Sequence, residues 1–272
     1  MARGRVPVGR IAVVVALVVA AYAIVRGTAA PRWKTLQPGL EFGTFRGEPY
    51  CRRGSSQIAL LRLDPGKVEL RVFHCSLQPD HRPLTPLEWQ RRLGATAVFN
   101  AGQYYPDLSY MGVLVCGGKV VSSRAHPGFR AALVASPATG GPAARVLDLE
   151  RTSIESERLR WREVAQSFML FDRDGSPRVR RSEQVANRTA VAEDRRGRIV
   201  VATTEGGYTL WEFARVLERS PLGLTHAMSM DGGREAELCV RTEGFRYASF
   251  ARWEDAEQGA APLPAVVAVG VR

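Results

Sequence analysis

Several familiar catalytic and metal-binding patterns are missing from this chain of 272 residues. It contains no G-x-S-x-G nucleophile turn, no G-x-x-x-x-G-K-[ST] phosphate loop and no H-E-x-x-H zinc motif. Its cysteines lack the C-x-x-C spacing of structural zinc sites, and nothing in the sequence implies a metal or another cofactor. Carboxylates and arginines are therefore the candidate chemical groups.

Lysine is scarce as well, with residues only at 34, 67 and 119, although the formal net charge is +11. Arginine therefore carries the positive charge. An excess of this sign suits an anionic ligand or surface, but a generally arginine-rich surface gives the same value. Basic and aromatic residues are not interleaved in clusters, so nucleic acid is not expected as a partner.

The N-terminal segment 1–30 contains no acidic residue and has the composition of an export signal. Arginines precede an apolar run at 11–25, which is short for a membrane-spanning helix of about 20 residues. Small residues end at Ala30, where a signal peptide would be cleaved, but Pro31 would hinder that cleavage. Two alternatives remain, a cleaved signal or an uncleaved membrane anchor. Both place 31–272, interpreted as one domain, in the periplasm or outside the cell.

The four cysteines, Cys51, Cys75, Cys116 and Cys239, fit that compartment. An even number in an exported chain allows two disulfides, and three pairings are possible. Proximity in sequence favours Cys51–Cys75, with Cys116–Cys239 joining distant parts. The alternative is four buried free thiols.

Short apolar segments separated by glycine and proline turns predict a strand-rich domain. Strands are expected at 57–64, 67–75, 95–100, 111–116, 119–123, 130–136, 167–171, 189–193, 198–203, 226–230 and 263–271. Two capping boxes, Thr85 with Glu88 and Thr209 with Glu212, start helices. The charged segment 150–165 is expected to be an exposed helix or a long connection. The predicted class is α+β, a single domain with a largely antiparallel β-sheet core flanked by a few helices.

Two of the apolar segments end in a polar residue followed by glycine. One ends at Asn100, before Gly102, and the other leads to Asp231, before Gly232 and Gly233. A buried strand that ends in this way presents a polar group at the mouth of a cleft, and the glycines allow close approach of a ligand. The two segments predict a site assembled from distant parts of the chain. The plain alternative for Asp231 is a turn.

Arg188 and Glu205 complete the candidate set. Arg188 directly precedes the strand that begins at Thr189, and its planar guanidinium group suits a phosphate or a carboxylate. Glu205 follows another strand and precedes two glycines. A glycosidase needs two carboxyl groups across the scissile bond, and Asp231 and Glu205 are the candidates. His226, within an apolar strand, is interpreted as a packed core residue rather than a base.

The order of these segments resembles the phosphodiester glycosidase family, in particular its exported bacterial branch. The resemblance covers roughly 90–272 and rests on segments at 99–105, 106–112, 188–192, 205–206, 209–214 and 230–233. Two segments depart from the family pattern. Residues 234–237, Arg-Glu-Ala-Glu, stand where glycine and serines are usual, and 167–169, Ser-Phe-Met, stand where Ser-Gly-Pro is usual.

The resemblance implies an exported hydrolase that cleaves a glycosidic bond adjacent to a phosphodiester in an anionic glycoconjugate. It implies that Asp231 and Glu205 act as acid and base, or as acid and nucleophile; no cofactor or metal is expected. The residues implied in substrate binding are Asn100, Gly102, Arg188, Thr189, Gly232 and Gly233. The departures leave open the alternative of a catalytically inactive envelope module of the same fold that binds anionic glycan.

Overall fold

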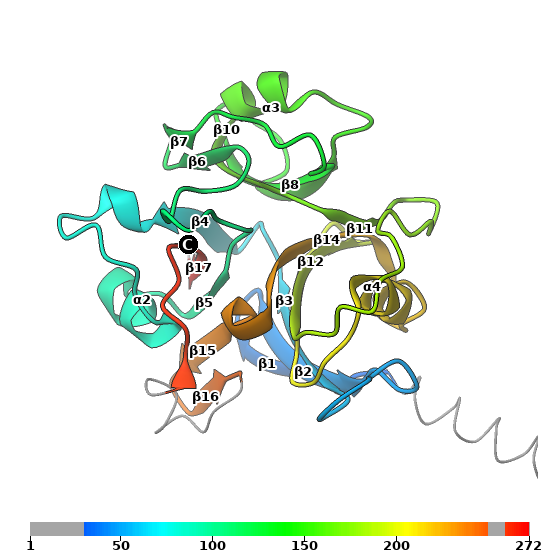
Figure 1. Cartoon of the computed structure of the whole chain (residues 1–272). Coiled ribbons are helices and arrows are strands. Elements are labelled where there is room, and N and C mark those ends of the chain that lie inside the picture. Colours follow the sequence, from blue (N-terminus) through cyan, green and yellow to red (C-terminus); the bar gives the residue numbers. More distant parts are fainter. Residues whose placement is uncertain (1–29, 250–258, 272) are drawn as a thin grey trace, which may run out of the picture.

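Antiparallel strands form three sheets that surround a common core, as Figure 1 shows. The computed structural model describes residues 30–249 and 259–271. Every pairing between its strands is antiparallel. The prediction of a largely antiparallel sheet core in one domain agrees with this arrangement.

The largest sheet has seven strands, and two of its inner strands are buried along their whole length. In order across the sheet, the strands are β1 (Lys34–Gln37), β2 (Leu40–Arg46), β3 (Gln57–Leu63), β13 (Ile199–Thr204), β12 (Arg188–Asp194), β14 (Leu224–Gly232) and β11 (Met169–Phe171). Every residue of β12 and β13 is buried, because apolar clusters cover both faces. Burial on both faces explains why their sequences do not alternate between apolar and polar residues.

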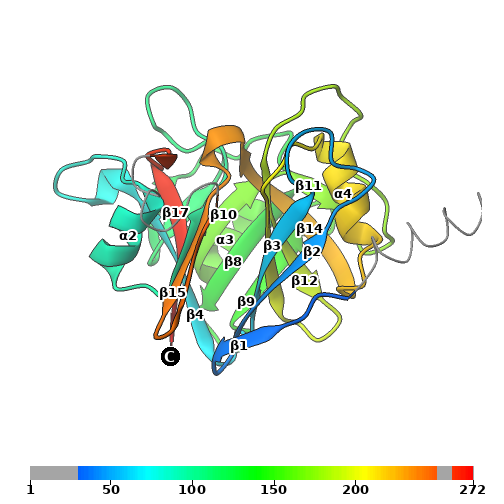
Figure 2. The same cartoon turned by 90° about the horizontal axis from the view of Figure 1, so that it is seen from below.

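Two five-stranded sheets complete the architecture. One consists of β7 (Lys119–Ser122), β6 (Leu114–Cys116), β10 (Trp161–Ser167), β8 (Ala131–Pro137) and β9 (Ala144–Asp148). The other consists of β16 (Phe245–Ala248), β15 (Leu238–Thr242), β5 (Ala97–Asn100), β17 (Ala265–Val271) and β4 (Val68–His74). In Figure 2 most strands run roughly from the top to the bottom of the view, and the three sheets lie around the core.

The core between the sheets receives side chains from all three of them. Leu61, Phe99, Leu133 and Val191, from β3, β5, β8 and β12, belong to one buried cluster. Each of these side chains is at most 1 % exposed. Burial of apolar surface is the main stabilising contribution to such a fold. Because the cluster is shared, the sheets cannot be expected to fold independently.

The described residues contain three α-helices, and each packs on a different sheet. Helix α2 (Pro86–Leu93) lies against β5, β15 and β17, α3 (Ile154–Arg160) against β10, and α4 (Leu210–Glu218) against β14 and β11. Both predicted capping boxes are confirmed: the side chains of Thr85 and Thr209 accept hydrogen bonds from the backbone N–H groups of Glu88 and Glu212.

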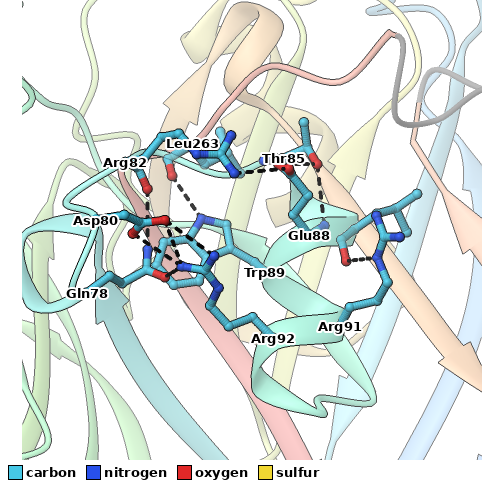
Figure 3. Close-up of polar contacts among 10 residues, drawn as sticks. Gln78, Asp80, Arg82, Thr85, Glu88, Trp89, Arg91, Arg92 and Leu263 are labelled. Atoms are coloured by element: carbon cyan, nitrogen blue, oxygen red, sulfur yellow. Dashed lines mark hydrogen bonds and ion pairs between the residues drawn. The ribbon is translucent and has the colours of Figure 1, made fainter.

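Polar contacts fix the position of α2, as Figure 3 shows. The indole N–H of Trp89, buried in the helix, donates to the backbone carbonyl of Leu263 at 2.9 Å. At the C-terminal end, Arg92 forms an ion pair with Asp80 at 3.3 Å and also donates to Gln78. These contacts join the helix to segments that precede and follow it in the sequence. They keep α2 packed against β5 and β17.

The expectation for 150–165 is wrong in part, because this segment includes most of a central strand. After the short helix α3, β10 lies between β6 and β8 in its sheet. The charge at Glu163 hides this strand from sequence analysis. In the structure the buried Glu163 carboxylate accepts hydrogen bonds from the backbone N–H groups of Val72 (2.8 Å) and Gly117 (3.1 Å). A buried carboxylate is tolerated where it has such donors.

Five strands were not predicted at all: β1, β2, β9, β15 and β16. The hairpin formed by β15 and β16 matters most, since β15 pairs with β5 and fixes the segment that follows Asp231.

The disulfide prediction is wrong for this structure, in which all four cysteines are free thiols. They belong to four separate environments. Cys75, Cys116 and Cys239 are buried in three different apolar clusters, and Cys51 lies beside a fourth. The alternative of free thiols therefore describes the chain, although the Cys51 thiol is half-buried rather than buried.

The proposed signal or anchor at 1–30 lies, apart from Ala30, outside the described residues, as does the whole apolar run at 11–25. Within 30–249 and 259–271, no helix is both long enough and apolar enough to cross a membrane.

Candidate functional site

The ends of β5 and β14 are joined by hydrogen bonds, which brings the two glycine-containing motifs together. The Asn100 amide nitrogen donates to the backbone carbonyl of Asp231 at 2.9 Å, and its oxygen accepts from the backbone N–H of Glu237 at 3.1 Å. The backbone N–H of Asp231 donates to the carbonyl of Ala101 at 3.0 Å. Asn100 is 1 % exposed, so its side chain positions the other residues of the site within the fold.

Asp231 lies at the end of β14, and its carboxyl group is half-buried. One carboxylate oxygen, Oδ1, accepts the backbone N–H of Gly232 at 2.8 Å. The pKa of Asp231 is raised to about 6, mainly by burial. The negative charge of Glu235 adds to this rise, while the Gly232 hydrogen bond and the charge of Arg188 oppose it. A carboxyl group with this pKa changes its protonation state close to neutral pH, as an acid–base catalyst requires.

Arg188 begins β12 directly opposite Gly232 of β14. Its guanidinium group is held at two positions, since Nε donates to the carbonyl of Tyr208 (3.0 Å) and Nη2 to that of Gln184 (2.8 Å). No ion pair within 4.0 Å joins it to a carboxylate of the described chain. Burial lowers the pKa of Arg188, and the charge of Asp231 opposes this. The side chain is therefore fixed by neutral acceptors and keeps its charge for a ligand.

At the three glycines predicted to bind substrate, a larger residue would crowd a neighbouring atom or strain the backbone. A Cβ on Gly102 would lie 2.4 Å from the Tyr110 hydroxyl oxygen, and one on Gly232 would lie 3.1 Å from Nη1 of Arg188. Gly233 has a φ of 76°, in the left-handed region that favours glycine. The glycines therefore allow the close packing of the motifs and the turn after β14.

Two site residues were not predicted, Tyr104 and Glu235. Glu235 belongs to the short helical turn η2 (Gly233–Glu235), visible near the centre of Figure 1 between β14 and β15. The Tyr104 hydroxyl donates to the Glu235 carboxylate at 3.3 Å. Burial, together with the charges of Glu235 and Asp231, raises the pKa of Tyr104 to about 12. The sequence signal was present, because Glu235 occupies one of the positions that depart from the family pattern.

Glu237 is a second unpredicted carboxyl group near the end of β14. It is 2 % exposed, and its Oε2 accepts the hydroxyl of Ser249 at 2.7 Å. Burial raises the pKa of Glu237 to about 8; the Ser249 hydrogen bond lowers it and the charge of Glu235 raises it. Glu237 is therefore mostly protonated at neutral pH.

Glu205, the second predicted catalytic residue, is engaged elsewhere. Its Oε1 accepts the side-chain N–H of Gln57 at 2.7 Å, and its Oε2 accepts the Ser55 hydroxyl at 3.1 Å. The carboxylate that acts on Asp231 electrostatically is that of Glu235. The catalytic role of Glu205 stays a prediction.

Thr189, predicted to bind substrate, is fully buried, with its hydroxyl 3.5 Å from that of Thr203.

His226 and Glu212 are used by the fold, as expected from the sequence. The buried imidazole of His226 contacts the carbonyl of Val146 at 2.7 Å. Glu212 completes the cap of α4 and forms an ion pair with Arg52. No group of three or more histidine, cysteine, aspartate or glutamate side chains suited to a metal ion occurs in the part of the chain that the structure covers.

The family model for phosphodiester glycosidases matches residues 93–270, the region that contains all of these motifs. The chain belongs to the phosphodiester glycosidase family. No protein with a curated description matches the sequence.

Solved structures support the family fold. The catalytic domain of zebrafish N-acetylglucosamine-1-phosphodiester alpha-N-acetylglucosaminidase, auto-inhibited by its pro-peptide, has a TM-score of 0.58 at 16 % identity. The comparison covers 90 % of this chain and 88 % of the zebrafish chain. A hypothetical protein from Synechocystis has a TM-score of 0.55 at 15 % identity, covering 90 % of this chain and 64 % of the other. At these identities, the likeness concerns the phosphodiester glycosidase fold alone.

Proposed function

We propose that this chain is an exported hydrolase that cleaves a glycosidic bond next to a phosphodiester in an anionic glycoconjugate. The observation that carries the proposal is the environment of Asp231: a half-buried carboxyl group with a pKa of about 6, near the buried cation of Arg188. Membership of the phosphodiester glycosidase family supports the same reaction. The export signal expected at 1–30 supports action in the periplasm or outside the cell.

The leaving group in this reaction is a phosphate monoester, which departs readily from the anomeric carbon. The more demanding step is therefore the activation of water, and the ionised Asp231 carboxylate is the proposed general base. It accepts a proton from water while the water oxygen bonds to the anomeric carbon. The bond from that carbon to the phosphate oxygen breaks, and its electron pair leaves with the phosphate. Arg188 is proposed to bind the phosphate and stabilise its charge.

Two residues remain candidates for the second carboxyl group of the site, beside Asp231. Glu205 was predicted from the sequence, whereas Glu235 interacts electrostatically with Asp231 and is contacted by Tyr104. We favour Glu235, because Ser55 and Gln57 already occupy both oxygens of Glu205. In this proposal, the Tyr104–Glu235 pair orients the sugar hydroxyl groups.

The proposal is tested by incubating the purified full-length protein with a panel of sugar phosphodiesters and measuring free sugar. The parent should release sugar, and Asp231→Asn, which keeps the shape of the side chain, should lower kcat by about 10²–10⁴-fold. Asp174→Asn, at an aspartate whose side chain is 76 % exposed, is the matched control and should leave turnover unchanged. Full turnover by Asp231→Asn would rule out its catalytic role.

A second candidate function is an inactive module that binds anionic glycan. It is favoured by the hydrogen bonds of Glu205 with Ser55 and Gln57, because these occupy a carboxylate that catalysis would need. In that case no substrate of the panel would be hydrolysed, yet the protein would still be retained on immobilised anionic glycan. Replacement of Arg188 by alanine should abolish the retention, provided that circular dichroism shows the variant to be folded. Nucleic acid is not a proposed ligand of either candidate.

A further inference from the structure

A pocket that the proposed function does not use lies beside the candidate site. Its volume is about 680 Å³, within the range of roughly 300–1,000 Å³ typical of small-molecule sites. His81 and three segments line it: the end of β4 with the turn after it (74–76), the loop 105–112, and the segment 121–127 that includes the end of β7. We call it the histidine pocket, after His74, His81 and His126 in its wall.

The histidine pocket and the Asp231 site share one loop. Tyr104 contacts Glu235 of the Asp231 site, whereas the next residue, Tyr105, lines the histidine pocket. Between them, the hydroxyl of Tyr110 accepts the backbone N–H of Gly102 at 3.1 Å and donates to the carbonyl of Gln166 at 2.9 Å. The two sites are thus neighbours, separated by a buried and fully bonded tyrosine.

The pocket wall presents hydrogen-bond donors that the protein does not use. Nδ1 of His126 accepts the backbone N–H of Gly128 at 3.2 Å, so the hydrogen of a neutral ring resides on Nε2. The His126 ring packs on Phe129 at 4.1 Å between centroids, and among the described residues its Nε2 forms no hydrogen bond. Arg124 is exposed, and within 30–249 and 259–271 its guanidinium group forms no ion pair. Both side chains can therefore donate to an anion.

Two other polar groups of the pocket have partners within the protein. The Asp107 carboxylate accepts both the backbone N–H (3.0 Å) and the hydroxyl (2.6 Å) of Ser109. Burial lowers the pKa of His74, and its Nε2 lies 3.1 Å from the carbonyl of Leu108. Among the residues that line the pocket, His74 is neutral, the exposed Asp107 carboxylate keeps its negative charge, and Arg124 supplies a positive charge.

An aromatic surface adds a second kind of contact. Tyr105 is 39 % exposed, although aromatic side chains are usually more deeply buried. Its ring offers a flat apolar face of the kind on which a sugar ring can pack, next to hydroxyl groups of Ser76 and Ser122. The pocket thus combines a cation, free donors and an aromatic face.

We propose that the histidine pocket is a second binding site that takes a phosphorylated sugar unit of the same anionic glycan. Arg124 and Nε2 of His126 bind its phosphate group, and Tyr105 packs against its ring. This inference rests on the proposed function, since a neighbouring unit of the polymer would reach this pocket while the scissile bond lies at Asp231.

The test is a calorimetric titration of the full-length Asp231→Asn protein, which is expected to bind without turnover, with N-acetylglucosamine 1-phosphate. N-acetylglucosamine and inorganic phosphate, titrated separately, measure the contributions of the ring and of the anion. Arg124→Ala and Tyr105→Ala are compared with Arg130→Ala, which replaces an exposed arginine outside the pocket. We expect Arg124→Ala to weaken binding about tenfold, as for the loss of a hydrogen bond to a charged group, and Arg130→Ala to change nothing.

The outcome separates this inference from the proposed function. Equal affinity in Arg124→Ala, Tyr105→Ala and Arg130→Ala, or no binding by any of them, would overturn the role of the pocket. Neither result affects the hydrolysis assay, which depends on Asp231. Conversely, binding that requires Arg124 in a protein without hydrolytic activity would support the pocket and contradict only the assigned reaction.

Discussion

Two carboxyl groups six residues apart, Asp231 and Glu237, show how the surroundings of a residue decide its chemistry. Both have a pKa above the ordinary range because of burial. Asp231 lies near the cation of Arg188 and has a pKa of about 6, whereas the Glu237 carboxyl group accepts a hydrogen bond from the neutral Ser249 hydroxyl and has a pKa of about 8. At pH 7 the first is mostly ionised and the second mostly protonated. Asp231 therefore suits a base, and Glu237 behaves as a neutral buried group.

The pKa of Asp231 predicts how activity depends on pH. A general base must be ionised, so kcat/KM should rise with pH, about tenfold per unit at low pH, and level off above about 6. The measurement is kcat/KM of the full-length protein on the best sugar phosphodiester between pH 4 and pH 8. The residual activity of Asp231→Asn should lack this rise. Activity that falls through pH 6 would identify Asp231 as an acid instead.

Glu237 predicts a pH dependence of stability. Its pKa in the folded state, about 8, lies above the ordinary value of 4.5, so the folded state holds the proton more tightly. Its contribution to stability is present at low pH and is lost as the pH rises from about 4.5 to about 8. Glu237→Gln should therefore raise the free energy of unfolding by about 1–2 kcal/mol at pH 9, which raises Tm by roughly 2–8 °C.

The control for this prediction is Glu243→Gln, at an exposed position of the adjoining turn. Thermal unfolding at pH 5 and pH 9 separates the two variants. A gain for Glu237→Gln that is as large at pH 5 as at pH 9 would show that titration is not its cause.

Interactions between residues close in sequence allow most helices and strands of this protein to be predicted. Strand β10 shows where such predictions fail. The capping boxes of α2 and α4 were read from four-residue patterns, because the groups that cap a helix lie next to it in sequence. Strand β10 was missed because its acidic residue Glu163 is satisfied by Val72 and Gly117, which are distant in sequence. An element whose polar groups find remote partners cannot be recognised from its own residues.

The caps predict a measurable loss of stability. Thr209→Ala removes the side-chain acceptor for the backbone N–H of Glu212, which lies at 3.1 Å, and should cost about 1 kcal/mol in urea unfolding. Thr242→Val serves as the control, because the buried hydroxyl of Thr242 has no hydrogen-bond partner among the residues that the structure describes. That variant should be neutral or slightly stabilising. Equal losses in both variants would mean that the cap contributes nothing specific.

At the scale of the whole molecule, one apolar cluster unites the three sheets. Phe99 in β5, Leu133 in β8 and Val191 in β12 belong to this cluster, although they are far apart in the chain. The strands that hold Asn100, Arg188 and Asp231 extend from this core, so the relative positions of these residues depend on the packing of all three sheets.

The shared core predicts a single cooperative unfolding transition. Phe99→Ala should destabilise the protein by about 3–5 kcal/mol, whereas Val120→Ala, at a side chain that is 48 % exposed, should change stability by less than about 0.5 kcal/mol. Unfolding in urea is followed by fluorescence and by circular dichroism. Transitions that do not coincide would show that the sheets unfold separately.

The sequence by itself determined the antiparallel strand-rich class, the two capped helices and the ordered motifs of the family, because these depend on neighbours along the chain. It also singled out Asn100, Arg188 and Asp231 as candidate site residues. Only the tertiary structure decided that Glu205 is bonded to Ser55 and Gln57, that Glu235 acts on Asp231 instead, and that the four thiols lie apart. These outcomes depend on burial and on contacts between strands remote in sequence, and neither spacing nor composition records them.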